Sequence, residues 1–197
     1  MKKIIVLLII LLVVTGCSFK DMFVRENKKI EYLSGKHNIE IKVKDYGVIK
    51  AELDADTAPI TVTNFIDLVN NKFYDGLTFH RIIEGFMIQG GDPSANGTGG
   101  SEQTIKGEFI ANGIPNDISH VRGVISMARA DDYNSASSQF FIMHKDNEGL
   151  DSYYAAFGHV TSGMDVVDKI AKVTSEPESG FVDYDRQPVI EYIKVVE

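Results

Sequence analysis

The sequence predicts a mainly β domain, a closed or nearly closed antiparallel β-barrel with two α-helices over its ends. Three observations support this fold class. Short stretches of alternating apolar and polar side chains recur along the chain, two stretches show helical spacing, and glycines mark the turns between them. The chain has 197 residues, which is enough for one domain with a full hydrophobic core and a short appendage.

The composition is that of a globular protein with an acidic balance. Apolar residues make up 44% and charged residues 24% of the chain, and the formal charge is −8. A chain this acidic is repelled by phosphate backbones, and it has no basic stripe, so nucleic-acid binding is set aside. Because no coiled-coil pattern is present, we expect a monomer.

The N-terminus has the pattern of a bacterial lipoprotein leader. Lys2 and Lys3 precede an apolar run over residues 4–14, which is too short to span a bilayer as a helix. The run ends in Val14-Thr15-Gly16-Cys17, which resembles a lipobox, where the cysteine thiol is lipidated and cleavage leaves it as the first residue. Cys17 is the only cysteine, so it cannot form an intramolecular disulfide. The alternative is a plain secretory signal with an incidental cysteine.

We therefore expect three parts: a lipoprotein signal peptide over residues 1–16, a lipidated cysteine and tether over 17–36, and a globular domain over 37–197. For the tether, a short packed helix from Met22 to Leu33 is the alternative. Lipid would hold the protein on a membrane surface without spanning it. This predicts a place in the cell envelope, on the outer face of the cytoplasmic membrane or on the outer membrane of an organism that has one.

The domain opens with a predicted β-hairpin, because residues 39–43 and 49–53 alternate around a turn at 45–47. A helix follows, since residues 62–69 carry apolar side chains at helical spacing after Pro59. Further strands are predicted over 123–129, 155–160 and 189–196, and a second helix over 164–173. The segments 79–92 and 135–143 are candidate strands.

Residues 90–100 are predicted to form a loop, because six of these eleven residues are glycine or proline. A phosphate-binding function is a weak alternative. No Walker lysine follows the loop, and no strand–loop–helix pattern frames it.

Arg81 is a cation within a run of large apolar side chains. Arginine is rarely buried without a partner and stays charged in proteins. A charged group among Ile83, Phe86 and Met87 therefore suggests a residue held at the wall of an apolar cleft. The alternative is an arginine that lays its stem on apolar surface and keeps its head in water. In a strand, the period of two places Arg81 on one face with Phe79 and Ile83.

The segment around Gln139 is the second candidate wall of a site. In a strand, Gln139, Phe141 and Met143 point to one face, while Phe140 and Ile142 point to the other. The first face combines an amide with an aromatic ring and suits a binding site, and the second suits the core. Gln139 could instead satisfy a backbone group near the sheet edge.

Six motifs in fixed order along the domain carry a resemblance to a known family. They are Phe79-His80-Arg81-Ile82-Ile83, Gly85-Phe86-Met87-Ile88-Gln89-Gly90-Gly91-Asp92, Ser126-Met127-Ala128, Ser137-Ser138-Gln139-Phe140-Phe141-Ile142, Leu150-Asp151 and Phe157-Gly158. On these motifs the chain from about residue 38 to 197 resembles a cyclophilin, a peptidyl-prolyl cis-trans isomerase. The resemblance implies a closed eight-stranded antiparallel barrel capped by two helices, with a proline site on its outer face.

The resemblance also implies roles for nine residues. Arg81 resembles the catalytic arginine of the family, with Phe86 and Gln89 beside it, and Tyr154 stands where many members have a histidine. The substrate-binding residues that it implies are Met87, Ala128, Gln139, Phe141, Leu150 and Tyr154.

Two positions depart from the family pattern. Gly149 stands where a tryptophan associated with cyclosporin binding is often found, so cyclosporin sensitivity does not follow from the resemblance. Arg129 is larger than the usual asparagine and carries a charge, which suggests a change in the residues accepted beside proline.

These residue types suit rotation about a peptide bond. The barrier is about 18–20 kcal/mol because resonance gives the C–N bond double-bond character. An arginine can favour the lone pair that forms on nitrogen as the bond twists, with no nucleophile, metal or cofactor. The expected partners are proline-containing unfolded or exported polypeptides, whose folding the enzyme would assist. The alternative is a chaperone module that binds X-Pro segments without turnover.

Overall fold

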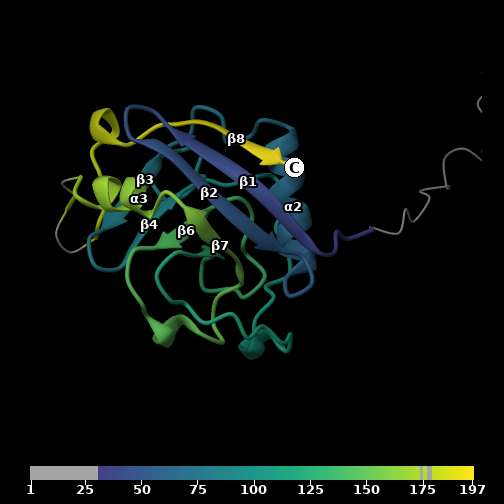
Figure 1. Cartoon of the computed structure of the whole chain (residues 1–197). Coiled ribbons are helices and arrows are strands. Elements are labelled where there is room, and N and C mark those ends of the chain that lie inside the picture. The colour runs from purple at the N-terminus through teal and green to yellow at the C-terminus, as the bar shows by residue number, and fades with distance from the viewer. Residues whose placement is uncertain (1–30, 174, 177–178) are drawn as a thin grey trace, which may run out of the picture. The chain divides into compact units, whose positions relative to one another are not determined.

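A computed structural model describes residues 31–173, 175–176 and 179–197 of the chain. Within these ranges an eight-stranded antiparallel sheet curls around a hydrophobic core, and two α-helices pack on it (Figure 1). The predicted mainly β class with eight strands and two helices is confirmed. The strands, in the order β3-β4-β6-β5-β7-β2-β1-β8 across the sheet, are β1 Lys36–Val43, β2 Gly47–Asp54, β3 Phe79–Ile83, β4 Met87–Gly90, β5 Val124–Met127, β6 Phe140–Met143, β7 Ala156–Ser162 and β8 Ile190–Val196.

The β1–β2 hairpin has the predicted alternation. Ile41 lies opposite Ile49 in β2 and opposite Ile193 in β8, and the first two of these side chains are fully buried. The polar residues between them face away from the core, which is the pattern of a sheet with one covered face.

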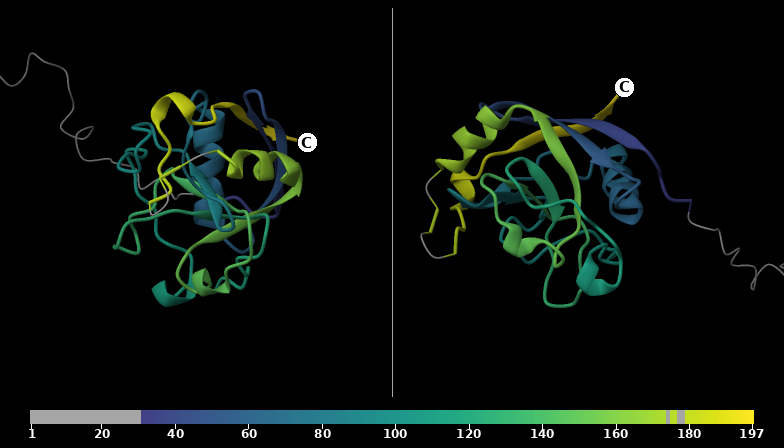
Figure 2. Two further views of the ribbon diagram at one scale, coloured as in Figure 1. Left: turned by 90° about the vertical axis from the view of Figure 1, so that its left-hand side faces the viewer. Right: turned by 60° about the horizontal axis from the view of Figure 1, so that its bottom comes forward.

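The two predicted helices, α2 (Pro59–Asn70) and α3 (Met164–Ala171), lie toward opposite ends of the curled sheet (Figures 1 and 2). Phe65 of α2 is fully buried among three aromatic rings, with ring centroids 4.9 Å from Tyr74, 5.4 Å from Phe140 and 5.2 Å from Phe157. Aromatic packing of this kind contributes beyond simple burial of area. It joins α2 to strands from the middle of the sheet.

The prediction of a closed barrel is wrong, because the sheet is an open half-barrel. Between the two edge strands, β3 and β8, there is no ladder, and only an isolated bridge joins Thr78 to Val189 just before each strand begins. Pro188 lies next to this bridge and has no N–H to donate, so it cannot extend the pairing. The outer edge of β3 is covered instead by residues 180–182, which exchange backbone hydrogen bonds with residues 80 and 82.

The predicted strand parity fails at Phe79 for a local reason. The β3–β4 register shifts between Phe79 and Arg81, so an extra residue, His80, is inserted at this point. Phe79 is therefore fully buried in the main core beside Phe140, whereas Arg81 faces the other side of the sheet. A β-bulge of this kind reverses the direction of the following side chains while the chain continues as a strand.

The residues just before β1 pack against the domain. Leu33 packs against the core, and its backbone N–H donates to Thr63 Oγ1 at 2.8 Å. The predicted signal peptide, Cys17 and the tether up to residue 30 lie outside the described residues. Within the described part of the chain, no helix is long and apolar enough to cross a bilayer.

A carboxylate from a distant loop caps α2. The helix has no side-chain cap at Ala58, yet both oxygens of the buried Glu108 accept hydrogen bonds at its first turn. They bind the backbone N–H of Ile60 at 3.0 Å and both the N–H and the hydroxyl of Thr61 at 2.7 Å. Negative charge at a helix N-terminus is stabilising, so Glu108 ties the loop to the helix.

We predict that Glu108→Ala lowers the free energy of unfolding by about 1–3 kcal/mol, because it leaves buried donors unsatisfied. Urea unfolding followed by circular dichroism measures this change. Glu102→Ala, an exposed glutamate in the same loop, is the matched control and should stay within about 0.5 kcal/mol of the wild type. Equal effects of the two substitutions would contradict the capping role.

Candidate active site

A second apolar cluster lies on the outer face of the sheet, opposite the main core. The β4–β6 register places Met87 opposite Met143 and Gln89 opposite Phe141. All four side chains leave the strands on the outer face, while Phe140 and its neighbours of the other parity enter the core. The alternation predicted for β6 is therefore confirmed: one face of the strand lines the site, and the opposite, purely apolar face packs in the core.

The residues singled out from the sequence surround two adjoining hollows on this face. The larger hollow has a volume of about 330 Å³, at the lower end of the range for ligand pockets. The smaller, of about 210 Å³, adds Gln139 and shares Gln89 and Ala128 with the first. The structure thus brings all nine predicted residues together. Those lining the larger hollow are Arg81, Phe86, Met87, Gln89, Ala128, Phe141, Leu150 and Tyr154, together with Gly97, Arg129 and Phe181.

Arg81 is half-buried at the wall of the larger hollow, as predicted. Its Nε donates to the carbonyl oxygen of Ser179 at 2.8 Å, and its Nη1 donates to Oε1 of Gln89 at 3.3 Å. Burial lowers the pKa of Arg81, but from so high an ordinary value that the guanidinium stays charged. Within the described residues Nη2 has no hydrogen-bond partner, so donors remain for a ligand in the hollow.

A chain of amides fixes the orientation of Gln89. The Nε2 of Gln139 donates to the carbonyl oxygens of Gly97 at 3.1 Å and Gly99 at 2.7 Å, which can only accept. Its Oε1 must therefore accept from Nε2 of Gln89 at 2.8 Å, which leaves Oε1 of Gln89 for Arg81. Gln139 is thus part of the site and does more than satisfy one backbone group.

The glycine-rich loop is held by its own carboxylate. The buried Asp92 accepts backbone N–H bonds from Ser94 at 2.7 Å, Asn96 at 3.1 Å and Gly97 at 2.6 Å. Burial alone would raise the pKa of Asp92, but these N–H groups together hold it below its ordinary value. The N–H groups that a phosphate would need are occupied, so the loop serves to place the carbonyl oxygens that orient Gln139.

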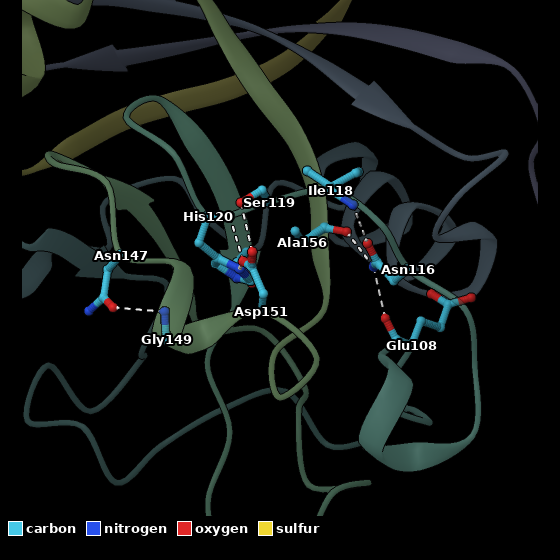
Figure 3. Close-up of polar contacts among 10 residues, drawn as sticks. Glu108, Asn116, Ile118, Ser119, His120, Asn147, Gly149, Asp151 and Ala156 are labelled. Atoms are coloured by element: carbon cyan, nitrogen blue, oxygen red, sulfur yellow. Dashed lines mark hydrogen bonds and ion pairs between the residues drawn. The ribbon is translucent and has the colours of Figure 1, made fainter.

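A buried histidine supports the floor of the hollow from behind. His120 stacks on the ring of Phe141, with ring centroids 6.0 Å apart. Its Nδ1–H donates to Asp151 at 2.8 Å (Figure 3). Its Nε2 lies 3.0 Å from the hydroxyl of Ser126, which donates to it. Asp151 also accepts a hydrogen bond from the hydroxyl of Ser119. One carboxylate therefore joins the loop after η2 (Glu148–Leu150) to the loop before β5.

Three residues that line or support the site were not predicted from the sequence: Phe181, His120 and Asp92. Phe181 comes from the segment that covers the β3 edge, stacks on His80 and lines the larger hollow. No local pattern marks it, because its place depends on pairing between residues far apart in sequence. The residues that the structure describes contain no group of three or more side chains able to hold a metal ion.

The fold and this site define a protein of the cyclophilin class, and comparison with known proteins agrees. Residues 38–195 match the family "Cyclophilin type peptidyl-prolyl cis-trans isomerase/CLD". The chain therefore belongs to this family and is a peptidyl-prolyl cis-trans isomerase.

Individual relatives support the same assignment. The chain is 41% identical to peptidyl-prolyl cis-trans isomerase A of Dickeya dadantii over 149 residues, which cover 73% of this chain and 76% of the relative. It is 46% identical to peptidyl-prolyl cis-trans isomerase B of Bacillus subtilis over 123 residues, 62% of this chain and 82% of the relative. A crystal structure of a Cryptosporidium parvum cyclophilin matches with a TM-score of 0.73 at 28% identity, covering 83% of this chain and 99% of that one.

The first 18 residues match a prokaryotic membrane lipoprotein lipid attachment site. The lipoprotein leader inferred from the sequence is thereby supported, and the protein is assigned to the cell envelope with a membrane anchor.

We predict that the domain loses stability as the pH falls below about 6.5, the ordinary histidine pKa. Burial lowers the pKa of His120, against the opposing effect of Asp151, so the unfolded chain binds its proton more readily than the folded one. Stability from this group is therefore present above the unfolded pKa and is lost on acidification, with a slope of at most about 1.4 kcal/mol per pH unit.

Urea unfolding between pH 7.5 and pH 5 measures this slope. His120→Gln should reduce it, leaving the part due to His80, whose pKa burial also lowers. His159→Gln, at an exposed position of β7, should leave the slope as in the wild type. A slope that His120→Gln does not change would show that other groups cause the acid sensitivity.

Proposed function

We propose that this enzyme accelerates X-Pro rotation by stabilising the twisted amide with Arg81 above an apolar proline pocket. The ring of proline fits the cup of Phe86, Met87, Phe141 and Leu150, rimmed by Tyr154. Burial of the ring there holds the C-terminal side of the X-Pro bond. Of the relatives, a structure of the C. parvum cyclophilin was solved in the presence of the dipeptide Ala-Pro, with a TM-score of 0.72 to this chain.

The substrate backbone is held by the polar side of the same hollows. Gln89 keeps one amide N–H for a substrate, while Gln139 keeps only acceptor capacity on Oε1, and both lie near the backbone of Ala128 beside the apolar cup. Binding of both sides of the X-Pro bond lets one side rotate relative to the other. A twisted amide carries a localised lone pair on nitrogen, and an Arg81 N–H interacts with it more strongly than with the planar ground state.

One observation carries the proposal: the guanidinium of Arg81 borders the apolar hollow with Nη2 unpartnered within the described residues, while its Nε and Nη1 are held. An arginine with fixed orientation and a spare donor is preorganised for electrostatic stabilisation. The snorkelling alternative would leave the whole head in bulk water.

We predict that Arg81→Ala lowers kcat/KM by about 10²–10³-fold, the range for loss of one preorganised transition-state donor. Magnetisation-exchange NMR on a short X-Pro peptide measures the rate, and urea unfolding checks that stability is retained. Arg186→Ala, outside both hollows, is the control. An Arg81→Ala rate equal to that of the wild type would refute the assigned role.

The binding-module alternative predicts a different result in the wild type. A chaperone without turnover would bind the X-Pro peptide but would not speed its isomerisation. Exchange between the cis and trans signals would then still take the uncatalysed time of about tens to hundreds of seconds. The relatives named above are all called isomerases, which favours catalysis.

We also propose that residues 1–16 are removed as a signal peptide and that lipidated Cys17 anchors the domain through a tether ending near residue 36. The isomerase domain over 37–197 would then act on exported polypeptides as they fold at the outer face of the cytoplasmic membrane, or at the outer membrane where one exists. Lipid chains supply such an anchor without a spanning helix.

We predict that the wild-type protein partitions into the detergent phase of a phase-separating detergent, whereas Cys17→Ser partitions into the aqueous phase. Mass spectrometry of the mature N-terminal peptide should show an acyl-modified cysteine. An unmodified Cys17 in the mature wild-type protein would exclude the lipid anchor.

A further inference from the structure

Arg129 is bound to main-chain carbonyl groups in the structure. Its Nε and Nη2 donate to the carbonyl oxygen of Tyr153 at 3.1 and 3.0 Å, and its Nη1 donates to those of Ala130 at 2.8 Å and Asp131 at 3.3 Å. A guanidinium has five N–H donors, so four of them are already engaged. This arrangement leaves little donor capacity for a substrate.

Three aromatic rings from different segments surround the same guanidinium. Its central carbon lies 4.8 Å from the ring centroids of Tyr133 and Tyr154 and 5.3 Å from that of Phe109. All three distances fall within cation–π range. Phe109 is buried in the main core and packs edge-on against Tyr133, so Arg129 is held against a rigid surface.

The contacts of Arg129 fix one side of the proline pocket. Tyr154 packs edge-on against Phe141 at 5.9 Å between centroids, and both rings line the larger hollow. The loop that carries Tyr154 begins at Asp151, which His120 and Ser119 hold. Arg129 holds the other end of this loop, at Tyr153 and Tyr154.

We propose that Arg129 is a positioning residue: it clamps residues 153–154 to the 129–133 loop and so keeps the Tyr154 ring at the rim of the proline pocket. This inference rests on the proposed function of the pocket. It differs from the sequence-based expectation that Arg129 changes which residues are accepted beside proline, because most donors of the guanidinium are bound to backbone carbonyl groups.

Lysine is the informative substitution at this position. It keeps the positive charge, but it has neither the planar face that stacks on rings nor the fork that bridges two carbonyl groups. Arg129→Lys should therefore abolish a clamping role. If Arg129 instead recognised the charge of the substrate, the lysine variant would still do so. Arg129→Gln removes the charge and the clamp together.

The test compares these variants on X-Pro peptides that differ only in having Glu, Ala or Lys before proline. The detergent-solubilised full chain is used, and KM and kcat are measured separately. We expect both Arg129→Lys and Arg129→Gln to raise KM by about three- to tenfold on all three peptides, with kcat within about twofold of the wild type. Arg186→Lys is the matched control and should change neither constant.

Tyr154→Leu supplies an independent measurement. If Arg129 acts through the Tyr154 ring, Arg129→Lys should change KM by less than about twofold in the Tyr154→Leu background. Circular dichroism verifies that each variant is folded, and Arg129→Gln replaces Arg129→Lys in this comparison if the lysine variant is unfolded.

Two outcomes would overturn the inference. One is a KM that Arg129→Lys leaves unchanged. The other is an effect of Arg129→Gln confined to the Glu peptide, which would make Arg129 a reader of charge. Failure of the proposed function gives a different result, since it would remove catalysis from the wild type or make Arg81→Ala harmless.

Discussion

The register between β4 and β6 is the constraint on which the site depends. It sets Gln89 opposite Phe141 on the outer face while Ile88 and Ile142 enter the core. A slip of one residue would exchange the two faces and bury an amide in place of apolar side chains. The same burial that stabilises the fold therefore fixes the composition of the hollow.

Around this register, a chain of hydrogen bonds that starts outside the hollow orients the polar part of the site. Asp92 binds the N–H groups of the glycine-rich loop, the carbonyl groups of that loop orient Gln139, and Gln139 orients Gln89 toward Arg81. The donor and the acceptor of each of these hydrogen bonds are fixed, because the backbone carbonyl oxygens that bind Gln139 can only accept. The result is an arginine with a defined donor geometry before any ligand arrives, which is the condition for electrostatic catalysis.

Much of the fold and of the site follows from local patterns in the sequence. Alternation predicted the hairpin and the two faces of β6, and helical spacing predicted α2 and α3. The bulge at His80, which turns Phe79 into the core, and the open seam between β3 and β8 did not follow, because both depend on pairing with distant residues. The supports from Glu108, His120 and Phe181 likewise join segments that no local pattern connects.

If the outer hollow binds proline with Arg81 at the rotating bond, a crystal structure of the protein with an Ala-Pro dipeptide should show it. We expect the proline ring among Phe86, Met87 and Phe141, with an N–H of Arg81 within about 3.2 Å of the dipeptide backbone. A dipeptide bound elsewhere, or an Arg81 side chain turned away from it, would refute this binding mode.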